Sequence, residues 1–165
     1  MEVEGDELPI LDGSGAIYYE IFKNLKSRRE KPVTFKNRLM FKNQKSMIFY
    51  IPSDNLKIYG LFPYGFRIFH ASYQEGLEKR VVEAKTFGWR IKSFPEIKEI
   101  KRTKNFTYLP PLRKNEFASH KILDFLGDLA LSSIYLLGKF FIFSSSHRAN
   151  HLFVKKIVKN RGEWI

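Results

Sequence analysis

The stretch SHKILDFLGD, residues Ser119–Asp128, places an imidazole and two carboxylates at successive steps of four residues. At about 100° per residue, His120, Asp124 and Asp128 lie within an arc of about 80° on a helix, and the apolar side chains of the stretch point the other way. A histidine and an aspartate four residues apart can reach one cation, and both supply ordinary zinc ligands. On spacing alone, a solvated helix face is the commoner outcome for such a pair.

Around this helix, the sequence predicts an α+β fold: a two-layer sandwich with a mainly antiparallel sheet and helices packed on one face. Short β-branched or aromatic runs between turn residues predict a meandering antiparallel sheet within residues 33–87. These runs are Met47–Ile51, Leu56–Phe62, Phe66–His70 and Lys79–Phe87. The other elements that we expect are a short strand at residues 1–7, a strand at Phe140–Phe143, and helices at Ala16–Lys26, Glu116–Leu137 and Ala149–Lys159.

The composition of the 165 residues is that of a globular protein, with 44% hydrophobic and 16% aromatic residues. There is no cysteine, so any zinc must be held by histidine, aspartate or glutamate. The acidic start of the chain lacks the basic and then apolar pattern of an export signal. The most apolar stretch, Leu129–Phe143, is shorter than the roughly 20 apolar residues of a membrane helix. We therefore expect a soluble, cytoplasmic protein with no transmembrane segment.

The net charge of +12 comes from basic residues that are scattered along the chain. Such a charge favours anionic partners in general, among them a nucleotide diphosphate and peripheral contact with an anionic membrane surface. The sequence has neither a glycine-rich phosphate loop nor the aromatic and basic pattern of an RNA-binding domain. We therefore expect no specific nucleic-acid partner.

Three blocks of sequence, in order and spread over most of the chain, carry a resemblance to a known family: Gly5–Gly15, Ala84–Gly88 and Glu116–Asn150. The last block resembles, without a gap, the zinc-binding half of the bacterial UDP-3-O-acyl-N-acetylglucosamine deacetylases, which catalyse the committed step of lipid A synthesis. The first block resembles the segment that ends the family's first domain, and the second resembles its Ala-Arg-Thr-Phe strand. The resemblance therefore implies a zinc-dependent amide hydrolase acting on a UDP-sugar that carries an acyl chain.

The resemblance also implies which residues would bind the metal and the substrate. His120 and Asp124 take the places of two of the family's three zinc ligands, and Lys121 takes the place of a substrate-contacting lysine. In such a reaction a metal-activated water attacks the N-acetyl carbonyl, and an acid protonates the departing amine. A lysine at a helix edge is otherwise usually a solvated surface residue.

Four further positions match the family's pattern: His147, Asp128, Thr86 and Phe87. His147 matches a catalytic histidine and Asp128 the residue that holds it; because His147 lies near a helix N-terminus, an imidazolium there needs an anionic partner. Thr86 matches a threonine that contacts the oxyanion or the metal-bound water, and Phe87 matches an aromatic residue of the substrate site. From the residues alone, a surface carboxylate at Asp128 and a loop residue at His147 would be the preferred interpretation, and Thr86 and Phe87 could equally be ordinary strand residues.

The family, by resemblance, has two similar two-layer domains with the active site between them. Residues 1–31 would then be the last strand and helix of the first domain plus a linker, and residues 32–165 the second domain, which bears the zinc site. The family's third zinc ligand and general-base glutamate form a Glu-His pair upstream of Gly5–Gly15, so a complete site would need a separate N-terminal half. His70, expected at a strand end, and His151, expected on a helix, are not expected to replace them.

Three interpretations of the chain stay open at this point. The first is the C-terminal half of a split or truncated deacetylase, the second a decayed, non-catalytic relative, and the third a basic binding module on the same fold. The family's insert between its counterparts of residues 87 and 120 is longer than here, which leaves acyl-chain binding open. An unpaired strand at Met1–Asp6 would pair with a partner or aggregate. We favour the first interpretation because the chain retains five matching residues together: His120, Lys121, Asp124, Asp128 and His147.

Overall fold

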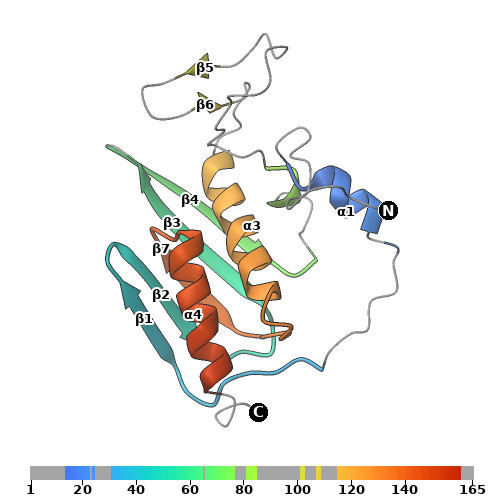
Figure 1. Cartoon of the computed structure of the whole chain (residues 1–165), viewed down its shortest axis with the longest axis vertical. Helices are drawn as coiled ribbons and strands as arrows, with labels where there is room; N and C mark the ends of the chain where they lie inside the picture. Colours follow the sequence, from blue (N-terminus) through green and yellow to red (C-terminus); the bar gives the residue numbers. More distant parts are fainter. Residues whose placement is uncertain are drawn as a thin grey trace.

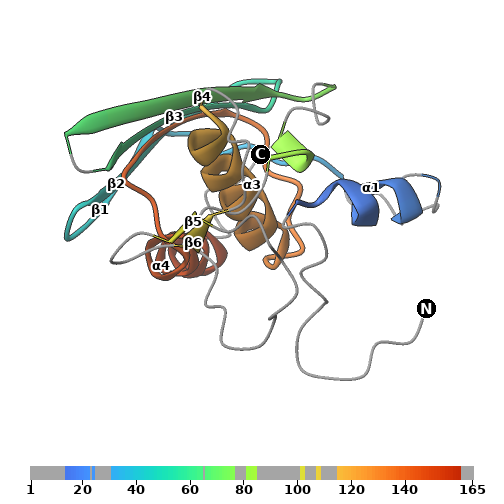
Figure 2. The same ribbon diagram turned by 90° about the horizontal axis from the view of Figure 1, so that it is seen from above.

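The chain folds into two layers, a five-stranded sheet and helices that cover one face of it (Figure 1, Figure 2). The structure, a computed structural model, describes residues 14–22, 24, 31–64, 66–76, 81–84, 101–102, 107–108 and 115–160. The predicted α+β class, with helices on one face, is confirmed. The strand predicted at residues 1–7 lies outside the described residues, and the domain division after residue 31 stays a prediction.

The sheet has the strand order β1-β2-β7-β3-β4, so a strand from late in the chain lies at its centre. β7 is antiparallel to β2 but parallel to β3, and the pairs β1–β2 and β3–β4 are antiparallel. The mainly antiparallel character is thus as predicted, whereas the simple meander is wrong. A central position gives an apolar strand hydrogen-bonding partners on both edges. The strands are β1 (Leu39–Asn43), β2 (Ser46–Ile51), β3 (Lys57–Tyr64), β4 (Arg67–Gln74) and β7 (Lys139–Phe143).

The chain differs from the predicted strands in several places, and β1 lies in the strand-like region 33–87 without having been one of the predicted runs. The described part of the run Lys79–Phe87 is a helical turn at residues 81–84, in which Ala84 N donates to Val81 O at 3.2 Å. Val81 is buried there, so its apolar, β-branched side chain packs in the core although it belongs to a turn. Two short strands that were not predicted, β5 (Lys101–Arg102) and β6 (Thr107–Tyr108), form a separate antiparallel pair.

The helices are α1 (Ala16–Phe22), α3 (Glu116–Ala130) and α4 (His147–Lys159). α1 ends four residues before the predicted Lys26. α3 ends seven residues before the predicted Leu137, because Ser133 adopts a left-handed conformation with φ 53° and the Ser132 hydroxyl donates to the carbonyl of Leu129 at 2.6 Å. α4 begins two residues earlier than predicted, because Ser146 is its N-cap and accepts a hydrogen bond from the backbone of the first turn.

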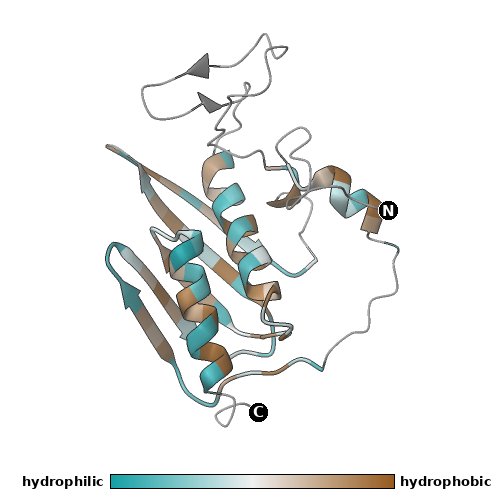
Figure 3. Cartoon of the chain, viewed as in Figure 1, coloured by the Kyte–Doolittle hydropathy of each residue, from teal (hydrophilic) through white to brown (hydrophobic). Residues whose placement is uncertain are grey.

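The core between the layers fixes the orientation of α3. Its apolar side packs Ile122 and Phe125 against the sheet, and the ring of Phe125 lies 5.4 Å from Phe140 of β7 and 6.1 Å from Phe153 of α4. Figure 3 shows hydrophobic and hydrophilic residues alternating around α3 and α4, as expected for helices that cover a sheet. The polar side of α3 is therefore held facing α4 and the turn at Ala84. Among the described residues, no helix has the length and apolar character needed to cross a membrane.

Candidate active site

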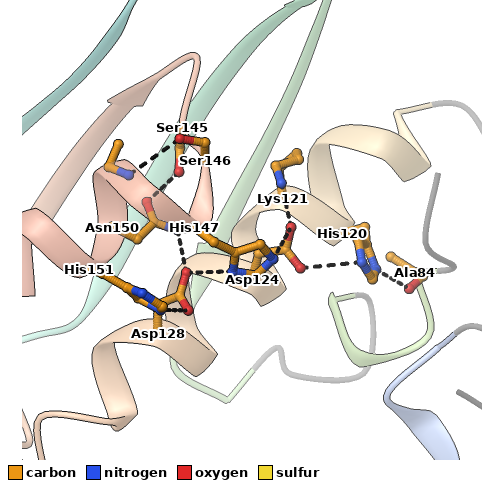
Figure 4. Close-up of polar contacts among 11 residues, drawn as sticks. Ala84, His120, Lys121, Asp124, Asp128, Ser145, Ser146, His147, Asn150 and His151 are labelled. Atoms are coloured by element: carbon orange, nitrogen blue, oxygen red, sulfur yellow. Dashed lines mark hydrogen bonds and ion pairs between the residues drawn. The ribbon is translucent and has the colours of Figure 1, made fainter. Parts of the chain in front are cut away.

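The polar side of α3 brings His120 and Asp124 face to face. His120 Nε2 lies 3.3 Å from Asp124 Oδ1, and the two side chains are 17% and 14% exposed. This contact follows directly from their spacing of four residues, which stacks side chains on adjacent helical turns. The close-up in Figure 4 shows the pair at one end of a continuous polar chain of residues from α3 and α4.

The contact of the second ring nitrogen of His120 determines the tautomer and the orientation of the imidazole. His120 Nδ1 lies 3.0 Å from the backbone carbonyl of Ala84, which can only accept a hydrogen bond, so Nδ1 carries the proton. In the neutral ring, Nε2 then presents a lone pair to the Asp124 carboxylate. Two such acceptors at 3.3 Å are favourable only with a proton or a cation between them. The pair is therefore a candidate cation site whose histidine is already oriented.

Asp124 is the centre of a group of nitrogen donors. Lys121 Nζ donates to Asp124 Oδ2 at 2.5 Å, and His147 Nε2 from α4 lies 3.7 Å from the same oxygen. The lysine side chain is 18% exposed and paired, so it is not the solvated surface residue that was the alternative to a substrate contact. One carboxylate thus offers Oδ1 toward His120 and Oδ2 toward a lysine and a second histidine.

Asp128, one turn further along α3, is a buried carboxylate with three donors. It accepts from His147 Nδ1 at 2.9 Å, from Asn150 Nδ2 at 2.8 Å and from His151 Nε2 at 2.9 Å. Asn150 is 0% exposed, and the Ser145 hydroxyl donates to its Oδ1 at 2.5 Å, which fixes the orientation of the amide. The buried amide of Asn150 therefore fixes Asp128 from the interior, and Asp128 in turn binds the exposed imidazoles of His147 and His151.

His147 is the first residue of α4, where the partial positive charge of the helix N-terminus opposes an imidazolium. Asp128 supplies a carboxylate at 2.9 Å from its Nδ1, which is the kind of anionic partner that such a charge needs. The imidazole is 61% exposed, so its other nitrogen is accessible. The arrangement can therefore present a donor, Nε2–H, at the side of the site where Asp124 lies.

A second group of residues could also hold a metal ion. Ligand atoms of Asp128, His147 and His151 all lie within 4.8 Å of one another. His147 and His151 contact different oxygens of the carboxylate, each at hydrogen-bond distance. The structure thus offers two places for a cation, this cluster of three and the pair His120 and Asp124.

The structure brings together five of the seven residues singled out from the sequence, and it adds three others. Thr86 and Phe87 lie outside the described residues. His151 is on a helix as expected, and the same spacing of four residues, counted from His147, is the signal that could have placed it in the site. His70 lies within β4 rather than at its end. The residues that the sequence did not assign a role are Ala84, Asn150 and His151.

Comparison with known proteins gives one consistent family. The family model described as UDP-3-O-acyl N-acetylglycosamine deacetylase matches residues 1–159. The UDP-3-O-acyl-N-acetylglucosamine deacetylase of Aquifex aeolicus (strain VF5) is 32% identical over an alignment of 181 residues. This alignment covers 98% of this chain and 64% of that protein. The relative of the same name from Syntrophus aciditrophicus (strain SB) is 26% identical over an alignment of 187 residues, which covers 99% of this chain and 59% of that protein. The chain spans about three-fifths of the length of these curated relatives.

Proposed function

Because this chain belongs to the UDP-3-O-acyl N-acetylglycosamine deacetylase family, we propose that it carries part of the active site of a zinc-dependent deacetylase of lipid A biosynthesis. The substrate would be UDP-3-O-acyl-N-acetylglucosamine, and the reaction hydrolysis of its N-acetyl amide to acetate and a glucosamine product. The observation that carries the proposal is the pair of facing atoms His120 Nε2 and Asp124 Oδ1, 3.3 Å apart on α3.

His120 and Asp124 would hold the zinc ion. Two ligand atoms at about 2.0–2.1 Å from one tetrahedral zinc lie about 3.3 Å apart, and the observed separation fits that value. The hydrogen bond from His120 Nδ1 to Ala84 is the kind of outer contact that orients a metal-binding histidine. When bound, zinc would supply Lewis-acid polarisation of the substrate carbonyl and a lowered pKa for the attacking water.

A third ligand would have to join this pair. Within the described part of the chain, no third histidine or carboxylate lies close enough to both His120 and Asp124 to share one ion. A catalytic zinc normally has three protein ligands and an open position. By resemblance, the third ligand and the general base form a Glu-His pair upstream of the block that matches Gly5–Gly15, and we propose that a further segment carrying such a pair completes the site.

His147 would donate a hydrogen bond to the oxyanion and then a proton to the departing amine. Its Nδ1 is fixed on Asp128, so Nε2 is the nitrogen left to face the substrate, on the side where Asp124 lies. Asp128 can hold the ring because Asn150 anchors the carboxylate from the buried side. Asp128 would therefore act through His147, as a residue that positions and balances the charge of the acid.

Lys121, Thr86 and Phe87 would contact the substrate. An ammonium group has three donors, so Lys121 can keep its bond to Asp124 and still donate to the sugar or the diphosphate. The roles of Thr86, as a donor near the oxyanion, and of Phe87, as an aromatic residue of the substrate site, rest on the family resemblance.

The proposal is tested by measuring zinc content and acetate release on the same samples. The chain is assayed alone and with the segment of the Aquifex aeolicus relative that it does not match, as wild type, as His120→Ala and as the control His70→Ala on β4. We expect weak zinc binding by the chain alone. With the added segment, zinc binding and acetate release should rise in the wild type and in His70→Ala and stay low in His120→Ala.

Other outcomes would contradict parts of the proposal. Tight zinc binding that survives His120→Ala would place the ion elsewhere, and a loss specific to His151→Ala would place it at the cluster of Asp128, His147 and His151. Zinc binding without acetate release in the reconstituted sample would support a non-catalytic relative. Salt-sensitive nucleic-acid binding without any effect of zinc would support a basic binding module instead.

A further inference from the structure

The face of the sheet that points away from the helices carries many exposed apolar side chains, and we call it the outer sheet face. In Figure 2 the labelled helices all lie on the opposite side of the sheet. Strand alternation directs every second side chain of the five strands to this face. Apolar surface that extends over a whole sheet indicates an interaction site. Its exposed apolar members include Met40, Met47, Tyr59, Leu61, Ile68 and Phe143.

The apolar side chains of the outer sheet face form a continuous surface. In register, Phe141 of β7 lies between Phe49 of β2 and Tyr59 of β3. The rings of Tyr59 and Phe141 stack with centroids 5.1 Å apart, and those of Phe49 and Phe141 lie 6.4 Å apart. The faces of these aromatic rings thus largely contact one another. Together the rings form a flat, apolar layer on the outer sheet face.

The charges on these five strands are all of one sign. By strand alternation, Lys42, Lys57 and Lys139 lie on the outer sheet face and Arg67 on the other face, and the five strands contain no aspartate or glutamate. Lys57 and Lys139 are direct neighbours in the register of the parallel pair of β3 and β7, so two cationic side chains leave the same face from adjacent positions. Like charges in this position are unfavourable, and no carboxylate of the described residues pairs with either lysine. An external anion over this pair would offset the repulsion.

We propose that the outer sheet face docks on the surface of an anionic lipid bilayer. Its apolar side chains would enter the boundary between head groups and acyl chains, while the lysines meet lipid phosphates. A second copy of the chain fits less well, because it would bring cations against cations. RNA fits less well too, because the aromatic rings stack on one another and aliphatic side chains occupy much of the surface. Docking of this face would not depend on zinc or on the deacetylase site.

The hairpin between β3 and β4 adds to this surface. Phe66 follows β3 at this turn and is fully exposed, and Ile68 at the start of β4 is 67% exposed. An aromatic side chain at a hairpin tip can enter a bilayer interface with little change in the fold. We expect this hairpin and the edge strand β4 to lie at the bilayer.

The first test is co-sedimentation of the full chain with vesicles of phosphatidylcholine alone or mixed with phosphatidylglycerol, in EDTA. We expect binding to the mixed vesicles that weakens with salt. Ile68→Ser should lower the partition coefficient at least fivefold, whereas Leu131→Ser, which alters a similarly exposed residue on the helix side, should leave it unchanged. Circular dichroism confirms that each variant is folded.

The charge contribution is tested in the same assay. Lys42→Gln and Lys139→Gln should each lower the partition coefficient for mixed vesicles about fivefold, since one lysine near an anionic surface contributes about 1 kcal/mol. The control changes Lys155 and Lys156, exposed residues of α4, to glutamine. These two lie on the far side of the molecule, beyond the Debye length of about 8 Å from the bound bilayer, so they should have little effect.

A label gives a measurement that does not depend on affinity. The chain has no cysteine, so a single cysteine at residue 68 or at residue 131 takes one environment-sensitive fluorophore. Mixed vesicles should shift the emission to the blue at residue 68 and not at residue 131. Absence of vesicle binding, or equal shifts at both residues, would overturn the proposal. A concentration-dependent dimer or poly(U) binding that Ile68→Ser abolishes would overturn it in favour of a second copy or RNA.

Discussion

Asp128→Ala is expected to destabilise the chain mainly through Asn150. Asn150 Nδ2 donates to Asp128 Oδ2 at 2.8 Å and the residue is 0% exposed, so alanine at 128 leaves a buried amide without its acceptor. Such a loss costs about 1–3 kcal/mol. The side chains of His147 and His151 are 61% and 51% exposed, so water can replace the carboxylate and each contributes on the order of 0.5 kcal/mol or less. We expect the free energy of unfolding to fall by about 2 kcal/mol.

Urea denaturation followed by circular dichroism measures this change, and a double-mutant cycle isolates the contact between Asp128 and Asn150. If the two side chains interact, the double variant Asp128→Ala/Asn150→Ala should lose about 1–2 kcal/mol less than the sum of the single variants. His151→Ala is the matched control and should cost at most about 0.5 kcal/mol. Strictly additive losses, or a loss in His151→Ala as large as that in Asp128→Ala, would refute the argument.

Further predictions concern the elements that hold the site and the zinc ion itself. Ser146→Ala removes the N-cap of α4 and should cost about 1 kcal/mol in urea unfolding, whereas Ser146→Asn should restore most of it; equal losses would mean that the cap is not used. Gly138→Ala should lower the free energy of unfolding by about 3 kcal/mol or more, because Gly138 has φ 145° and an added Cβ would clash with the Tyr50 ring. Gly127→Ala is the contrast: its added Cβ meets nothing within 4 Å, so it should stabilise α3 by about 0.5–1 kcal/mol. Zinc at about 100 times its Kd should stabilise the reconstituted protein by about 2.7 kcal/mol, seen as a higher Tm that EDTA reverses; the same gain in His120→Ala would exclude the proposed ligand pair.

The apolar period of α3 is enough to predict which side of that helix packs on the sheet, because Ile122 and Phe125 have no other way to leave water. The end of the helix could not be predicted in the same way. Ile134 and Leu137 continue an apolar pattern past Ala130, and they do pack against the core, but from the segment that follows a turn in which Ser133 is left-handed. The hydrophobic pattern predicts which residues are buried, whereas the local hydrogen bonds of the serines determine where the helical backbone conformation ends.

For the candidate site, the contacts within one helix follow from spacing and those between helices do not. His120 and Asp124 share α3, so a spacing of four residues predicts their contact. Asp128 meets His147, Asn150 and His151 only because α4 lies beside α3, and that placement depends on where β7 enters the sheet. The sequence shows β7 as an apolar run, but it does not show which strands will flank it.

The turn from β7 into α4 is where the sheet determines the position of His147. Ser144 has φ 52°; its N–H donates to the carbonyl of Leu61 in β3 at 3.0 Å, and its carbonyl accepts from the hydroxyl of Ser46 in β2 at 2.6 Å. Both neighbours of β7 thus hold the residue that precedes Ser145 and the N-cap Ser146, and α4 begins at a fixed place over α3. Because these contacts belong to this chain alone, the bond between His147 and Asp128 should form without a partner. A segment that carries the remaining ligands would then have only to add them to a site whose other side is already assembled.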